Sequence, residues 1–281
     1  MRSYFAHAPK LYAYSLNYIL YDFEETMIND TTDYRPSHYL IAWAVHAFTA
    51  SAACFGLLTL VKIYQHDYIF ALWFMAIAVV IDAVDGTFAR LVRVKSILPG
   101  IDGALLDNIV DYLNYVITPC FFLYVKPDMI PAEWGILIIL AIILTSAYQF
   151  CQADAKTPDH FFKGFPCYWN IAIFYMIIFN TATASNAIIL ALLCVLVFVP
   201  IKYVYPSRLD YLTPSKNLKI IMHCSSIVYG VTSALILWSY PEISPICLAL
   251  SLAYVIMYLV LSVYRTCYPL PIYNQQTADK T

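Results

Sequence analysis

Charged residues are scarce in this sequence of 281 residues: Asp, Glu, Lys and Arg together make up 12%, about half the share in an ordinary soluble domain. Hydrophobic residues reach 62%, and the mean hydropathy is +0.68. This balance excludes a soluble globular protein and a disordered chain. The net charge of −2 shows no strong excess of either sign, so nothing indicates a nucleic-acid or polyanionic partner.

Other absences narrow the class further. The eight cysteines are scattered, with no CxxC pair and no Cys/His cluster of metal spacing, and are typical of small apolar packing residues. Residues 1–37 contain no charge-free run long enough for the apolar core of a secretory signal. The alternating polar pattern of membrane β-strands is missing too, so helices are expected.

Long apolar stretches are what the sequence has in abundance. Most approach the roughly 20 residues that cross a hydrocarbon core as a helix. The eight stretches are residues 38–61, 68–88, 103–125, 132–151, 167–181, 185–205, 218–239 and 244–264. The sequence therefore predicts an all-α polytopic membrane protein with about eight transmembrane helices.

The basic residues predict its orientation, because short loops rich in Lys and Arg stay on the cytoplasmic side. If the loop with Arg90, Arg93 and Lys95 is cytoplasmic, all but two of the 16 basic residues lie inside, the exceptions being Lys62 and Lys126. Both termini are then cytoplasmic.

We find no internal repeat and predict one membrane domain, residues 38–265, between an N-terminal tail, 1–37, and a C-terminal tail, 266–281. Apolar residues recur at roughly helical spacing between Leu11 and Phe23. That spacing fits an amphipathic helix on the inner membrane surface; a loosely ordered tail is the alternative.

Four aspartates interrupt the apolar stretches, whereas the other 14 acidic residues lie in tails or loops. Asp82 and Asp85 end the second stretch, and Asp107 and Asp111 begin the third. Each pair shares one helix face, and the short connection makes the two helices antiparallel neighbours whose faces can converge. One such carboxylate costs about 2.5–3.5 kcal/mol in a membrane helix, so four close together require a partner. All-oxygen ligands favour Mg²⁺ or Mn²⁺.

Three of the seven glycines, Gly86, Gly100 and Gly103, fall in this same stretch. Their missing side chains clear space for a bulky group beside the metals. Arg90 lies next to the acids at the cytoplasmic edge, where a guanidinium can hold phosphate. The pattern predicts a diphosphate substrate that carries a lipid tail.

The segment from Asp82 to Asp111 also resembles a known family signature. DAVDGTFAR, twelve residues and then GALLDNIVD match all eight positions of DxxDGxxAR…GxxxDxxxD, the signature of the CDP-alcohol phosphotransferases. The twelve-residue spacer is longer than in most of the family and resembles the bacterial phosphatidylcholine synthase branch. AWAVHAFTASAACFGLL and FFKGFPCYWN also resemble that branch, and the resemblance covers roughly residues 40–265.

This resemblance implies transfer of the phosphatidyl group of CDP-diacylglycerol to choline, with release of CMP, at a two-metal site. It also implies a protein of the bacterial inner membrane whose active site faces the cytoplasm. A homodimer is expected. The resemblance assigns metal ligation to Asp82, Asp85, Asp107 and Asp111, general-base catalysis to Asp111, and binding of the CDP moiety to Gly86, Ala89, Arg90 and Gly103.

Choline is a quaternary ammonium that cannot donate hydrogen bonds, so it prefers aromatic faces. Tyr115, one turn beyond Asp111, is a candidate choline contact, as are Tyr168 and Trp169 at the start of the fifth helix. Packing or an interfacial aromatic belt is the alternative for each.

Two features of the first and third helices predict local structure. His46, Thr49 and Ser51 form a polar patch that favours interhelical hydrogen bonds. Pro119 is predicted to bend the third helix.

Several alternatives stay open from the sequence. Serine, inositol or glycerol 3-phosphate could be the acceptor, or CDP-choline the donor with diacylglycerol as acceptor. A cation-coupled transporter is the alternative outside the enzymes, because intramembrane carboxylates also mark ion pathways. Transporters tend to have paired broken helices in two halves, and no such pairing is evident here.

Overall fold

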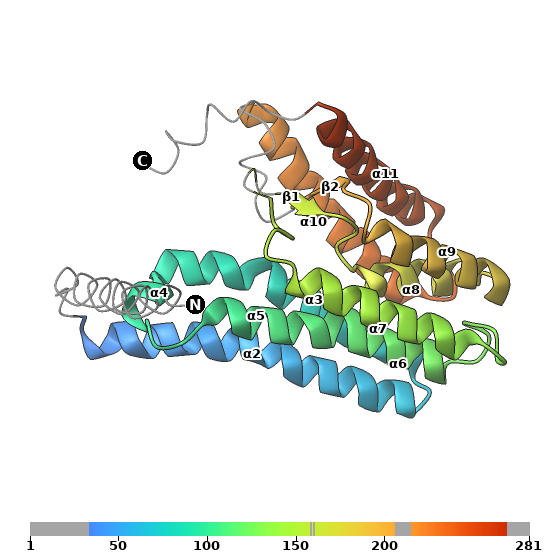
Figure 1. Cartoon of the computed structure of the whole chain (residues 1–281), viewed down its shortest axis with the longest axis horizontal. Coiled ribbons are helices and arrows are strands. Elements are labelled where there is room, and N and C mark those ends of the chain that lie inside the picture. Colours follow the sequence, from blue (N-terminus) through green and yellow to red (C-terminus); the bar gives the residue numbers. More distant parts are fainter. Residues whose placement is uncertain (1–33, 158, 160, 206–214, 269–281) are drawn as a thin grey trace, which may run out of the picture. The chain divides into compact units, whose positions relative to one another are not determined.

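The computed structural model describes residues 34–157, 159, 161–205 and 215–268 (Figure 1). The chain divides into two compact units, Met1–Ile41 and Ala42–Thr281, and every contact discussed below lies within the second. The amphipathic helix predicted between Leu11 and Phe23 lies outside the described residues, as do residues 269–281 of the predicted C-terminal tail.

Helices dominate the described chain. Four are long and apolar enough to cross a membrane: α2 (Pro36–Tyr64), α3 (Tyr68–Val92), α10 (Lys216–Ser239) and α11 (Pro245–Cys267). The shorter helices are α4 (Val94–Ile97), α5 (Gly103–Tyr112), α6 (Thr118–Val125), α7 (Gly135–Cys151), α8 (Trp169–Ile178) and α9 (Thr183–Leu196). The chain is a helical membrane protein.

Each of the eight predicted apolar stretches contains helix, but the lengths differ from those expected. α8 and α9 have only 10 and 14 residues, short of the roughly 20 that span a hydrocarbon core. The sixth stretch was expected to continue to residue 205; its helix ends at Leu196, and Lys202–Val204 forms strand β2 instead. The number of eight crossings therefore stays a prediction.

Exposure along the long helices fits a lipid environment. In α11 only 11% of the most apolar 18-residue stretch is buried, and in α10 only 22%. Large side chains such as Ile246, Ile256 and Trp238 are more than half exposed. Water would not tolerate so continuous an apolar surface, whereas lipid tails cover it at no cost.

The third predicted helix changes its hydrogen-bond register in the middle. A π-helix, η1 (Leu113–Ile117), links α5 directly to α6, so residues 103–125 are helical throughout. Pro119 lies in the first turn of α6, where it cannot donate to the carbonyl of Tyr115 four residues earlier. The wider π turn accommodates Pro119 without breaking the helix.

A two-stranded antiparallel sheet joins distant parts of the chain. β1 (Phe161–Lys163) pairs with β2, with Phe161 opposite Val204. Two hydroxyls of α11 complete the free edge of β2: Thr266 Oγ1 accepts from the Lys202 amide at 2.8 Å, and Ser262 Oγ from the Val204 amide at 3.2 Å. These hydrogen bonds hold the two-stranded sheet against α11.

Lys202 also forms an ion pair with Asp159, with 2.5 Å between Nζ and Oδ2. Burial tends to raise the pKa of Asp159, but the hydrogen bonds from Lys202 and Thr157, together with the charge of Lys202, hold that pKa below its usual value.

Close approach of α2 to η1 depends on Gly56. A Cβ atom added there would lie 2.6 Å from Oδ1 of Asn114, which is buried. Asn114 cannot easily move away, because its Nδ2 donates to the carbonyls of Ala52 and Val110, both at 3.1 Å. The contact fixes α2 against the third helix near its midpoint.

We expect Gly56→Ala to destabilise the protein by about 1–3 kcal/mol, because the added methyl group overpacks this contact. Gly230→Ala in α10 is the matched control, since no atom lies within 4 Å of its added Cβ and alanine favours a helix. Thermal unfolding in detergent should show a lower Tm for Gly56→Ala and an unchanged or higher Tm for Gly230→Ala. Equal shifts in the two variants would contradict the close approach.

Candidate active site

Three aspartates from two helices meet at one point in the membrane domain. Asp82 of α3 and Asp107 and Asp111 of α5 each offer a carboxylate oxygen, and these oxygens lie within 4.8 Å of one another. Two unit charges at such a distance repel by about 3 kcal/mol at an effective protein dielectric of about 20. The donor set consists of carboxylate oxygens alone, which suits a hard divalent cation. The cluster therefore fits a divalent metal.

Asp85 stands apart from these three carboxylates. Its side chain is buried and faces the Thr49 hydroxyl of α2, the backbone of Gly86 and the charge of Arg90. It still lies close enough to Asp82 and Asp107 to interact with them electrostatically. Residues three apart on a helix share a face only approximately. Here Asp82 turns toward α5, whereas Asp85 turns toward α2.

A buried tyrosine orients the Asp82 carboxylate. Tyr115 Oη donates a hydrogen bond to Asp82 Oδ2 at 2.6 Å, and the Tyr115 side chain is 8% exposed. Hydrogen bonds of this kind fix the direction in which a metal-ligating carboxylate points. The residue predicted as a choline contact is thus also a support for the acid cluster.

The other two candidate choline contacts differ from each other. The Tyr168 ring lies beside that of Tyr115, with 6.1 Å between centroids, next to the acid cluster. Trp169 is fully buried, its Nε1 donates to Ser146 Oγ at 2.8 Å, and its ring packs edge-on against Phe165. Tyr168 and Tyr115 are therefore brought together, whereas Trp169 lies in the helix-packing core.

The small and basic residues of the signature have specific neighbours. Arg90 is exposed, and its Nη2 donates to Thr87 Oγ1 at 3.0 Å. A Cβ at Gly86 would lie 3.3 Å from Arg90 Nη1, and one at Gly103 would lie 3.1 Å from Cε1 of His46. The space predicted beside these glycines is thus used by protein side chains, while Ala89 stays half-buried and Gly100 has open space.

Two further residues, one beside the acid cluster and one beside Tyr168, could not be identified as site residues from the sequence. Lys156, in the loop after α7, interacts electrostatically with Asp82, Asp107 and Asp111, and its Nζ lies 5.6 Å above the Tyr205 ring. The Tyr258 ring of α11 lies 6.4 Å from that of Tyr168. Both come from parts of the chain remote in sequence, so only their positions in the fold identify them.

The polar patch of α2 differs from its prediction. Ser51 Oγ donates to the Phe48 carbonyl at 2.6 Å, within the helix. Thr49 Oγ1 lies 3.4 Å from the Val45 carbonyl of its own helix and also faces the Asp85 carboxylate of α3, so it does join two helices. His46 is 8% exposed and its Nε2 has no hydrogen-bond partner among the described residues. Interhelical hydrogen bonding was the wrong expectation for Ser51 and His46.

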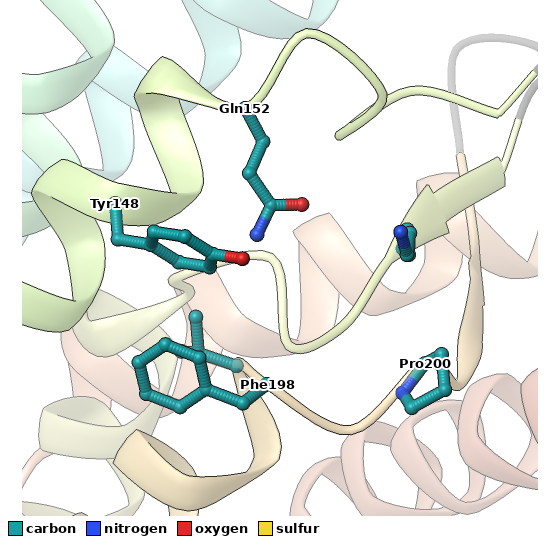
Figure 2. A pocket seen from close by; sticks show the side chains of 6 residues that line it. Tyr148, Gln152, Phe198 and Pro200 are labelled. Carbon is teal, nitrogen blue, oxygen red and sulfur yellow. The ribbon is translucent and has the colours of Figure 1, made fainter.

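A separate pocket lies between the end of α7, β1 and the segment after α9. In Figure 2 the Tyr148 hydroxyl and the Gln152 amide point into it, and the Phe198 ring packs 5.0 Å from the Tyr148 ring, centroid to centroid. Lys163, Val197 and Pro200 complete its lining. None of the eight signature residues borders it, so it is distinct from the acid cluster.

The sequence profile of the family described as CDP-alcohol phosphatidyltransferase matches residues 43–199, which is more than half of the chain. This chain belongs to that family. The match includes α2 from residue 43 onward, both helices of the acid cluster and the Tyr168 region. The CDP-alcohol phosphatidyltransferases generally use divalent metals, in agreement with the oxygen-rich cluster described above.

Within the family, the chain is similar to curated proteins named phosphatidylcholine synthase. The one from Legionella pneumophila is 68% identical over 234 residues, covering 83% of this chain and 92% of the relative. The one from Legionella bozemanae is 72% identical, covering 77% of this chain and all of the relative. A more distant one, from Borreliella burgdorferi, is 39% identical over 70% of this chain and 83% of the relative.

Proposed function

We propose that this protein is a phosphatidylcholine synthase, which transfers the phosphatidyl group of CDP-diacylglycerol to choline and releases CMP. The observation that carries the proposal is the cluster of Asp82, Asp107 and Asp111 inside the membrane domain. The identity to curated phosphatidylcholine synthases supports the choice of choline as the acceptor.

Asp82, Asp107 and Asp111 would hold divalent cations, which we propose to be two Mn²⁺ or Mg²⁺ ions. Asp85 lies outside this group of three but interacts electrostatically with Asp82 and Asp107, and we propose it as a further ligand that would turn from Thr49 toward the ions. Bound there, such ions would neutralise the diphosphate and stabilise the departing CMP. Tyr115 holds the Asp82 carboxylate through its hydrogen bond and keeps it directed at the cluster. Arg90, exposed at the end of α3, binds a phosphate oxygen with its guanidinium, and Gly86, Ala89 and Gly103 border the CDP moiety.

Asp111 acts as the general base in this proposal. The choline hydroxyl forms a new bond to the phosphatidyl phosphorus, the bond from that phosphorus to the CMP oxygen breaks, and the hydroxyl proton passes to Asp111. A choline hydroxyl is a weak nucleophile at neutral pH, so a carboxylate that accepts its proton in the transition state accelerates the attack.

Choline binds in this proposal against the rings of Tyr115 and Tyr168, next to the base. A quaternary ammonium near a tyrosine face gains about 0.5–2 kcal/mol. Tyr258, whose ring adjoins that of Tyr168, adds a further aromatic face from α11. Trp169 is left out of the choline site because its indole is enclosed by Ser146 and Phe165.

Tyr168→Ala is expected to raise the KM for choline about tenfold with little effect on the KM for CDP-diacylglycerol, because one aromatic face is lost. Tyr168→Phe is the matched control, since it keeps the ring and removes only the hydroxyl. Steady-state kinetics at varied choline would measure both. An unchanged choline KM in Tyr168→Ala would remove Tyr168 from the site.

The membrane arrangement is part of the proposal. Eight crossings with both termini in the cytoplasm of a bacterial inner membrane would place the acid cluster at the cytoplasmic surface, where choline enters and CMP leaves. The distribution of Lys and Arg supports this orientation. We also propose a homodimer, which crosslinking in native membranes would test.

The proposed activity is tested with purified protein, CDP-diacylglycerol, choline and Mn²⁺ in detergent. CMP release that depends on choline, with phosphatidylcholine as the lipid product, is expected. CMP release with serine, inositol or glycerol 3-phosphate alone would assign another acceptor. Labelled CDP-choline supplied with diacylglycerol tests whether CDP-choline is the donor and diacylglycerol the acceptor. Choline-independent cation uptake into vesicles without CMP release would indicate a transporter.

A further inference from the structure

His46 is a buried histidine of α2 whose ring nitrogen Nε2 has no hydrogen-bond partner among the described residues. The side chain is 8% exposed, so water does not readily replace that partner. A buried polar atom without a hydrogen bond is costly, so each such atom in a native protein requires an explanation, and a bound ligand is one. The position of His46 suggests what the reason is.

The imidazole lies against the beginning of α5. Its Cε1 is 3.1 Å and its Nδ1 3.8 Å from the point where a Cβ of Gly103 would stand. Gly103 is the signature residue one turn before Asp107, so the absence of its side chain makes room for the histidine ring. The Trp43 ring also lies beside the imidazole, in a T-shaped arrangement with 6.2 Å between ring centroids.

The same face of α2 borders the other signature helix. Thr49, three residues after His46, faces the Asp85 carboxylate of α3. Further along, the contact between Gly56 and Asn114 fixes the distance between α2 and the third helix. α2 is therefore a third wall of the site, and His46 is its polar residue nearest to the start of α5.

The level of His46 along α5 indicates which part of a substrate it meets. Gly103 precedes Asp107 by four residues, about 6 Å along the helix axis, on the side of the exposed N-cap Asp102. A lipid-linked diphosphate at the acid cluster extends its acyl chains into the membrane and its nucleotide toward water. A nucleotide bound in this direction would lie at the level of Gly103 and His46.

We propose that His46 binds the cytidine nucleotide of the lipid donor through its Nε2. A neutral imidazole has one donor and one acceptor nitrogen, which suits a ribose hydroxyl or the edge of cytosine. The proposal rests on the proposed function only in requiring a CDP-linked donor. It makes His46 a substrate-binding residue outside the eight-residue signature.

The test compares His46→Ala, His46→Gln and His46→Asn with the wild type as full-length proteins in detergent. The amide of Gln can reach the Nε2 position and that of Asn only the Nδ1 position. Calorimetric titration with CMP in the presence of Mn²⁺ gives the nucleotide affinity, and steady-state kinetics gives separate KM values for CDP-diacylglycerol and choline. His223→Ala, a change at an exposed histidine of α10, is the control expected to match the wild type.

His46→Ala is expected to raise the Kd for CMP and the KM for CDP-diacylglycerol about tenfold, the effect of losing one hydrogen bond, while the choline KM stays within about twofold. His46→Gln is expected to recover most of the CMP affinity, and His46→Asn little of it. Unchanged CMP affinity in folded His46→Ala, or equal affinities of the Gln and Asn variants, would overturn the proposal.

Failure of all three variants to fold would assign His46 to packing and overturn it as well. If the wild type binds CMP but transfers the phosphatidyl group to a different alcohol, the proposed function fails while the role of His46 remains.

Discussion

Asp111→Asn is expected to fold normally and to lose about 10²- to 10⁴-fold in turnover, the usual contribution of a general base. Asparagine has nearly the same shape but cannot accept the proton of the choline hydroxyl. The substitution also removes one of three like charges that lie within 4.8 Å of one another. We therefore expect a Tm equal to or above that of the wild type in metal-free buffer, together with the loss of turnover.

The control for Asp111→Asn is Asp67→Asn. Asp67 pairs with Lys62 at 3.1 Å between α2 and α3, outside the acid cluster, and its replacement should leave turnover unchanged. Phosphatidylcholine formation from CDP-diacylglycerol measures turnover in both proteins. Near-normal turnover in Asp111→Asn would show that another group, or water alone, accepts the proton.

Removal of divalent cations is expected to abolish phosphatidyl transfer, and addition of Mn²⁺ or Mg²⁺ should restore it. Charge stabilisation by bound cations contributes several kcal/mol in such reactions, and about 4 kcal/mol corresponds to about a thousandfold in rate. Asp107→Asn should therefore lower turnover about a thousandfold and weaken Mn²⁺ binding, measured by electron paramagnetic resonance of the free ion.

Asp154→Asn provides the matched acid outside the cluster. Asp154 forms an ion pair with Lys163 at 2.6 Å, and this hydrogen bond lowers the pKa of the exposed Asp154 carboxyl. Its loss should affect neither Mn²⁺ binding nor turnover. Full activity after exhaustive chelation, or wild-type Mn²⁺ affinity in Asp107→Asn, would contradict a metal site at the cluster.

The sequence predicted the helices better than their ends. A run of apolar residues indicates a membrane helix through composition alone, so each of the eight stretches was found. The sheet of β1 and β2 was missed, because its pairing joins Phe161 to Val204 across more than forty residues and is completed by hydroxyls of α11. Short strands with such remote partners leave no periodic signal.

The sequence predicted that Asp82, Asp107 and Asp111 lie together, but not that Asp85 turns away from them or which residues surround them. The spacing of Asp107 and Asp111 places them on one helix face, and the short connection brings Asp82 to them, so local geometry was sufficient. Trp169 was a reasonable candidate by position, but its side chain turns inward to Ser146. Which way a residue at a helix start turns depends on the packing of neighbouring helices.

By itself, the sequence determined a helical membrane protein with the eight-residue signature of the CDP-alcohol phosphatidyltransferases, because hydropathy and residue spacing act over short distances along the chain. Only the tertiary structure decided that Asp85 faces α2, that Tyr115 supports Asp82, and that His46 lies against Gly103. These contacts join helices through close packing at positions such as Gly56, and the fit of side chains between helices is not encoded in the period of any one of them.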